Sequence, residues 1–120
     1  MTGQVTDNMA VLEVPVHLSG HPPLSIEFVI DTGFAGFLTM PPAAVAALKL
    51  PFFYKMPANL ADDSNITVEV YTTTILWQGK ERDVEILAMG KRPLIGRALL
   101  HGNETCIQFV EHGLVTITPL

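Results

Sequence analysis

Apolar and polar residues alternate with a period of two along several stretches of the chain, and this pattern predicts β-strands. Residues 11–18 and 24–31 are two such stretches, separated by the turn sequence SGHPP, so they are predicted to form a hairpin. Residues 66–77 and 82–89 flank the sequence QGKE and predict a second hairpin. Residues 105–117 predict a final pair of strands around the turn sequence EHG.

Two segments predict short helices. Residues 41–50, PPAAVAALKL, start with prolines, are rich in alanine and precede Pro51, which predicts a helix of about two turns. The segment LIGRALLHG, residues 94–102, has room for only a turn or two. The chain is therefore predicted to be mainly β with one or two short helices, and the many short strands predict a closed or barrel-like β domain.

Length, charge and composition restrict the possible functions. The 120 residues predict a single domain, 1–120, which is too small for two full catalytic lobes. Seven Lys and Arg against twelve Asp and Glu, without a basic run, argue against nucleic acid or an anionic membrane as a partner. The N-terminus has no signal-peptide pattern and no stretch approaches a membrane span, so the cytoplasm is the expected location. Cys106 cannot form an internal disulfide and is expected to be a buried thiol.

One carboxylate, Asp31, follows the apolar run FVI and precedes Thr32 and Gly33. A strand that ends in this way places the acid in a loop, where glycine lets the backbone turn and allows another backbone to approach. Two interpretations are open for an isolated Asp-Thr-Gly sequence. The acid can stabilise a tight turn through its own backbone, or it can take part in chemistry.

The tripeptide is not isolated, because FVIDTG is followed far downstream by LIGRALL. This pair resembles the signature of the retropepsin-like (clan AA) aspartic proteases of the single-domain, homodimeric type. The pattern is most similar to stand-alone bacterial members and retroviral proteases, and it extends over about residues 11–109. The resemblance implies an aspartic endopeptidase with a single-lobe, closed β-barrel and a flap hairpin at about 58–70.

The chemistry of such enzymes sets a requirement on the number of carboxylates. Two carboxylates share one proton; one activates the attacking water and the other protonates the carbonyl oxygen of the peptide. Only Asp31 is followed by Thr-Gly or Ser-Gly. The other aspartates, which lack that context, are Asp7, Asp62, Asp63 and Asp83. The second carboxylate must therefore come from Asp31 of another copy, so the expected enzyme is a homodimer acting on a peptide or protein substrate.

The resemblance also implies roles at the positions that match the family motifs. Asp31 is the expected catalytic acid, the Thr32 hydroxyl reaches the partner's loop, and Gly33 allows close approach of water and substrate. Gly96 lets the second loop pack beneath the first, with Arg97 in the same structural loop. The residues expected to bind substrate are Phe34, Ala35, Asp62, Asp63, Ser64, Leu94 and Ile95. No cofactor or metal is implied.

Several positions depart from the family pattern. Asp63 replaces the glycine that is frequent at the flap turn. Ala35 stands where retroviral proteases have an acid that pairs with the arginine, so Arg97 needs another partner. The chain also continues beyond Phe109, and a C-terminal hairpin at about 105–118 is predicted to form the dimer interface.

Two alternatives stay open. His17 and His21 are four residues apart on a strand-to-turn segment, where this spacing does not direct both rings at one metal ion, so a metal site is not favoured. The second alternative concerns function: a non-catalytic retropepsin-fold dimer could serve as a peptide-binding or assembly module, since fold alone does not establish activity. The intact Asp31-Thr32-Gly33 sequence favours the enzyme, whereas the altered flap turn and Ala35 favour the module.

Overall fold

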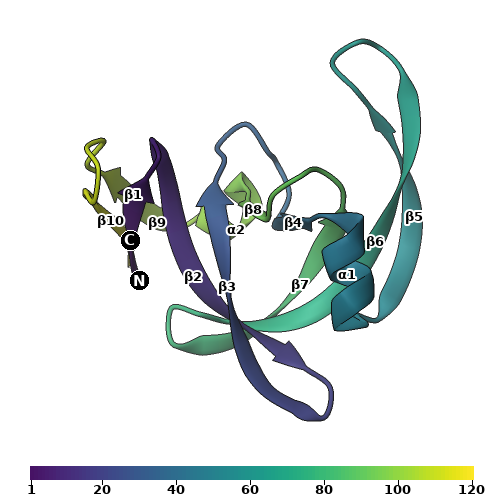
Figure 1. Cartoon of the computed structure of the whole chain (residues 1–120), viewed down its shortest axis with the longest axis horizontal. Coiled ribbons are helices and arrows are strands. Elements are labelled where there is room, and N and C mark those ends of the chain that lie inside the picture. Colours follow the sequence, from purple (N-terminus) through teal and green to yellow (C-terminus); the bar gives the residue numbers. More distant parts are fainter.

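The computed structural model describes all 120 residues, which form ten strands and two short helices (Figure 1). The strands are β1 (Thr2–Thr6), β2 (Met9–Leu18), β3 (His21–Ile30), β4 (Leu38–Met40), β5 (Phe52–Asn59), β6 (Asn65–Trp77), β7 (Lys80–Ala88), β8 (Leu94–Ile95), β9 (Asn103–Ile107) and β10 (Leu114–Pro119). The helices are α1 (Pro42–Leu48) and α2 (Arg97–Leu100). Neither helix is long and apolar enough to cross a membrane.

All the strands belong to one sheet, in the order β5-β6-β7-β4-β8-β3-β2-β1-β10-β9. The pairings are antiparallel except for β3 with β8 and β4 with β7. The sheet curves so that β2 also meets β6, at the single pair Val16 and Ile75. The fold is thus mainly β, as predicted; only one residue pair links β2 back to β6, and β5 and β9 lie at the two ends of the sheet.

Alternating burial along the strands builds the core. On β2, for example, Leu12, Val14 and Val16 are buried while Glu13 is exposed. These side chains belong to a cluster of sixteen buried residues to which α1 contributes Val45. Burial of each large apolar side chain stabilises the fold by about 1.5–3 kcal/mol, so this cluster holds the curved sheet together.

The predicted hairpins and helices are present. β2 pairs with β3 and β6 pairs with β7, and the second turn lies at Gln78 and Gly79. Both turn residues have positive φ values, 52° and 76°, as expected for a two-residue turn that matches the twist of the strands. Helix α1 has a proline at its start and ends at Lys49, which adopts a left-handed conformation. The sequence pattern did not predict β1 or the length of β5, because apolar and polar residues do not alternate regularly in these two segments.

Cys106 is a correction, because its thiol is exposed and not buried. It lies on β9, where the partly buried side chains are those of Asn103, Thr105 and Ile107. The alternation along the strand therefore places Cys106 on the solvent side, next to Glu104, with 3.7 Å between its sulfur and a carboxylate oxygen. An apolar neighbour in the sequence was not sufficient to predict burial, because β9 is short and lies at the end of the sheet.

The pairing of the C-terminal strands restricts which residues of the predicted dimer interface, 105–118, can pair with a partner strand. β10 pairs with β1 on one edge and with β9 on the other, so it has no free edge for a partner strand. Its side chains Val115 and Ile117 are only 0% and 1% exposed. Val115 and Ile117 are therefore part of the core, and of the C-terminal strands only the outer edge of β9 is free to pair with another chain.

We expect Ile117→Ala to lower the free energy of unfolding by about 2–5 kcal/mol, because it leaves a cavity beneath an inner strand. Chemical denaturation followed by circular dichroism measures this change. Thr118→Ala, at the exposed neighbouring position on β10, is the matched control and should change stability by less than about 0.5 kcal/mol. Equal stability of the two variants would show that β10 is not a core strand.

Candidate active site

Asp31 is the first residue after β3 and lies in a partly exposed position. Its backbone N–H donates a hydrogen bond to the Ile95 carbonyl oxygen at 2.9 Å, which holds the end of β3 against β8. One oxygen of its carboxylate, Oδ1, accepts a hydrogen bond from the Gly33 N–H at 2.9 Å. Thr32 and Gly33 are both exposed. The carboxylate is therefore oriented by its own loop and stays accessible from outside the chain.

The loop that carries Asp31 is fixed by a strand from much later in the sequence. β8 lies between β3 and β4, the two strands that precede and follow this loop. Ile95 pairs with Ile30 of β3 in a parallel register and with Leu38 of β4 in an antiparallel register. The structure thus brings together the sequences FVIDTG and LIGRALL, as predicted.

Three backbone hydrogen bonds continue this contact beyond β8. Gly96 N–H donates to the Phe37 carbonyl oxygen at 2.9 Å, Arg97 N–H to that of Phe34 at 2.8 Å, and Ala98 N–H to that of Gly36 at 3.2 Å. A Cβ atom on Gly96 would lie 2.2 Å from the Gly36 oxygen and 2.5 Å from the Phe34 ring. A side chain at position 96 is therefore incompatible with this arrangement of the loop.

Phe34 fills the space that the glycines leave. A Cβ atom on Gly36 would come within 2.6 Å of the Phe34 ring, so the ring packs directly over that residue as well as over Gly96. Phe34 is partly buried, and the neighbouring Ala35 is exposed. Of these two residues, which were both expected to bind substrate, Phe34 has a clear role in shaping the loop.

The remaining predicted residues near this loop differ in exposure. Leu94 is partly exposed, but Ile95 is fully buried in the main core, so its side chain is not accessible to a ligand in this structure. Arg97 is exposed and forms no ion pair, since the salt bridge of this structure is between His17 and Glu81 at 3.7 Å. Arg97 therefore has no acidic partner within the chain.

The predicted flap corresponds to the hairpin of β5 and β6, which extends beyond the rest of the sheet (Figure 1). At its tip the Asp63 N–H donates to the Leu60 oxygen, and the Leu60 N–H donates to the Ser64 oxygen. This is a three-residue loop whose last residue, Asp63, has a φ of 63°. The aspartate thus adopts the left-handed conformation that glycine takes most readily.

Asp62 and Ser64 stabilise the same turn. The Asp62 carboxylate accepts hydrogen bonds from both the hydroxyl and the backbone N–H of Ser64. The hydroxyl, followed by the backbone N–H, lowers the pKa of Asp62 below its usual value of 3.8. No hydrogen bond joins this tip to residues 31–36, although both project toward the same side of the molecule in Figure 1.

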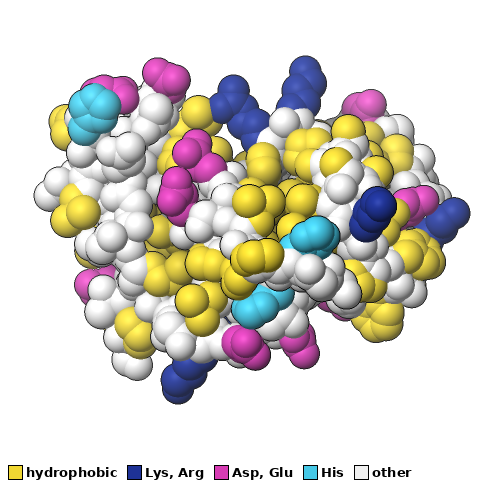
Figure 2. All heavy atoms as spheres, turned by 60° about the horizontal axis from the view of Figure 1, so that its bottom comes forward, with side chains coloured by type: hydrophobic (Ala, Val, Ile, Leu, Met, Phe, Trp, Pro, Cys, Tyr) yellow, Lys and Arg dark blue, Asp and Glu magenta, His cyan; other side chains and the backbone are white.

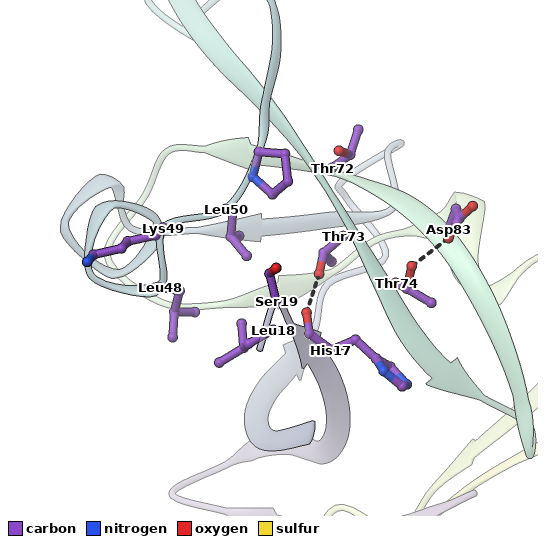
Figure 3. Close-up of a pocket in the computed structure, with 11 residues that line it drawn as sticks. His17, Leu18, Ser19, Leu48, Lys49, Leu50, Thr72, Thr73, Thr74 and Asp83 are labelled. Carbon is purple, nitrogen blue, oxygen red and sulfur yellow. Dashed lines mark hydrogen bonds between the residues drawn. The ribbon is translucent and has the colours of Figure 1, made fainter. Parts of the chain in front are cut away.

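Two well-formed hollows of the single chain lie away from Asp31. Two adjoining pockets of about 540 and 590 Å³ lie between the turn of β2 and β3 and the end of α1, and the first also reaches the middle of β6. In the first pocket, the Thr73 hydroxyl donates to the His17 carbonyl and the Thr74 hydroxyl to Asp83, and Lys49 points away from the cavity (Figure 3). The view of this side shows hydrophobic side chains near the centre with two histidines beside them (Figure 2). No motif in the sequence predicted these pockets.

His17 and His21 line different pockets, and His17 is close to Glu81. No group of three or more His, Cys, Asp or Glu side chains is arranged to hold a metal ion. The Asp31 carboxylate accepts its hydrogen bond from the backbone N–H of Gly33, in the same loop.

We expect Gly96→Ala to displace the Asp31 loop and to destabilise the protein by about 1–3 kcal/mol, because backbone atoms must move to accept the new methyl group. NMR chemical shifts of residues 31–36 and thermal unfolding measure the two effects. Gly20→Ala is the control for the chemical shifts: its Cβ meets nothing within 4 Å, so the shifts of residues 31–36 should stay unchanged, although its positive φ costs about 1–2 kcal/mol of stability. Unchanged shifts of the loop in Gly96→Ala would contradict the close contact described above.

We expect Ser64→Ala to raise the pKa of Asp62 toward 3.8, since the strongest cause of the lowered value is the Ser64 hydroxyl. Because the folded-state pKa is lowered, the turn is fully stabilised above the unfolded pKa and loses this stabilisation as the pH falls through the lowered value. NMR titration of the Asp62 carboxyl carbon measures the shift, with Ser25→Ala as a control. An unchanged pKa would mean that the hydroxyl does not hold this turn.

One of three comparisons with known proteins supports the fold. No protein-family model matches the chain, and no curated protein matches its sequence. Among solved structures, it is similar to the crystal structure of a retropepsin-like aspartic protease from Rickettsia conorii, with a TM-score of 0.62 and 15% sequence identity. The match covers 99% of this chain and 89% of the other. The chain therefore has a fold similar to that of a retropepsin-like aspartic protease.

Proposed function

We propose that the protein is an aspartic endopeptidase that is active as a homodimer, with one Asp31 carboxylate from each subunit. The observation that carries this proposal is the position of Asp31-Thr32-Gly33 at the end of β3, on a loop fixed by β8, in a retropepsin-like fold. A turn-stabilising role alone does not require the carboxylate to stay accessible. Asp31 uses one oxygen for the Gly33 N–H and remains partly exposed.

The arrangement of the single chain favours a two-fold partner. The loop after β3, the tip of the β5–β6 hairpin and the loop between β9 and β10 all project toward the same side in Figure 1. The last of these loops exposes Phe109 and Val110, at 61% and 65%. A second copy packed on this side would cover those side chains and bring the two Asp31 loops together, with the Thr32 hydroxyls available to bond across the interface.

The reaction then follows from a pair of carboxylates that holds one proton. The ionised carboxylate takes a proton from a water molecule, whose oxygen attacks the carbonyl carbon of the peptide. The protonated carboxylate donates its proton to the carbonyl oxygen, which gives a tetrahedral diol. When the C–N bond breaks, a proton passes from the pair to the leaving nitrogen, and the pair takes a proton from one hydroxyl of the diol, so that it again holds one proton. The β5–β6 hairpin, including Asp62, Asp63 and Ser64, would cover the bound peptide as a flap.

We expect Asp31→Asn to leave the dimer folded and to abolish peptide cleavage. Because each active site needs one carboxylate from each subunit, only dimers of two wild-type chains should be active in a mixture of the variant and the wild-type protein. After subunit exchange, activity should fall with the square of the wild-type fraction. Cleavage of an extended peptide with apolar residues beside the scissile bond is the measurement, and analytical ultracentrifugation checks that the dimer persists.

A linear fall of activity with the wild-type fraction would contradict the shared site, because it would mean that each chain acts alone. Residual cleavage by pure Asp31→Asn would assign the chemistry to another residue. A stable wild-type dimer that binds extended peptides and cleaves none would favour the non-catalytic module, for which Asp63 at the flap turn and Ala35 in the loop are the motivating observations.

A further inference from the structure

Basic side chains are concentrated on both sides of β8. Lys91 and Arg92 precede this strand and Arg97 follows it, so three of the chain's seven Lys and Arg residues lie within the segment 91–97. All three are exposed. Because β8 is the strand inserted between β3 and β4, these cations flank the element that holds the Asp31 loop.

Acidic side chains are missing from the same region. The chain has twelve Asp and Glu residues and a net charge of −5, yet residues 32–61 and 86–103 contain none. Asp31 is thus the single carboxylate of residues 28–61, and β3 carries one further acid, the exposed Glu27. Lys91, Arg92 and Arg97 thus make the segment 86–103 locally positive on a protein that is acidic as a whole, and such a local field favours negatively charged ligands.

The cations are not neutralised within the chain. The salt bridge of this structure lies between His17 and Glu81, on the strands β2 and β7, and does not involve residues 91–97. Arg92 contacts only the sulfur of Met9, at 2.8 Å, and a thioether is a weak acceptor without charge. The guanidinium groups therefore keep their capacity to bind a carboxylate.

Arg97 is the best placed of the three. Its backbone N–H donates to the Phe34 oxygen at 2.8 Å, so its Cα lies against the loop that follows Asp31. Ala35, which follows Phe34 in that loop, is exposed, and its methyl side chain cannot pair with an arginine. An arginine fork can bind both oxygens of a carboxylate, and no carboxylate of this chain occupies it.

We propose that Arg97 forms an acid-recognising subsite, so that preferred substrates carry a Glu or Asp side chain near the scissile bond. This proposal rests on the proposed function, because the acidic side chain belongs to a substrate bound in the cleft of the protease. Lys91 and Arg92 add to the local positive field, whereas Arg97 makes the direct contact.

The test compares extended peptides that differ only by Glu or Gln, placed in turn at each position beside a central apolar pair. For one position we expect kcat/KM to be roughly fivefold or more higher with Glu, since a charge-assisted hydrogen bond is about twice as strong as a neutral one even where solvent weakens it. Arg97→Gln should remove this preference and Arg97→Lys should retain part of it. Arg97→Glu should reverse it in favour of a peptide with Lys at that position.

Lys80→Gln is the matched control, because it removes the same charge at the exposed turn of β6 and β7 and should leave the preference intact. Loss of the preference in Lys80→Gln as well would assign it to net charge and overturn the role of Arg97. Equal cleavage of Glu and Gln peptides at every position, with cleavage still dependent on Asp31, would overturn the subsite and leave the protease proposal standing.

Absence of cleavage for all peptides would contradict the proposed protease function. A binding measurement then tests the acid-recognising subsite separately. Fluorescence anisotropy of the labelled Glu and Gln peptides provides this second readout on the wild-type protein, which avoids any variant that fails to fold. Tighter binding of a Glu peptide that is lost in Arg97→Gln supports the subsite, whereas equal or absent binding of both peptides overturns it.

Discussion

The insertion of β8 between β3 and β4 is the contact on which the rest of the candidate site depends. A two-residue strand, Leu94–Ile95, pairs in parallel with the strand before the Asp31 loop and antiparallel with the strand after it. Without β8, the two ends of the loop would have no common support. The absence of a side chain at Gly96 makes the contact possible, because the Gly36 oxygen occupies the space that a Cβ atom would need. Rigid support of this kind holds a reactive group in position better than an independent loop can.

This arrangement leaves the carboxylate on an open face of the chain. The sizeable pockets of the single chain are at the other end of β2 and β3, and Asp31 lines neither of them. A reactive acid that lines neither of these pockets needs something to complete its surroundings. In the proposed dimer, the partner supplies the second carboxylate and the far wall, and the two hairpins of β5 and β6 supply the cover. The unpaired cations beside β8 would then face the substrate and not bulk solvent.

Much of the fold could be predicted from the sequence because the strong signals are local. Alternation predicted β2, β3, β6 and β7, and the prolines before the alanine-rich segment predicted α1. The sequence did not predict β1 or the full length of β5, since neighbouring strands decide whether weakly alternating segments pair. The exposure of Cys106 and the burial of Ile95 also depend on position in the sheet, which residue type alone does not determine. For the site, the paired motifs predicted which segments meet, but the role of Phe34 and the lack of acids in residues 86–103 became informative only once the geometry was known.

The separation of the two Asp31 carboxylates in a crystal structure of the assembled protein tests the central claim most directly. A shared proton requires their nearest oxygens to lie within about 2.6–3.2 Å of each other, or to be bridged by one water molecule. We predict a two-fold dimer with this geometry, in which the loops carrying Asp31, Thr32 and Gly33 face each other across the axis. A protein that stays monomeric at all concentrations, or a dimer whose Asp31 carboxylates lie far apart, would contradict the account.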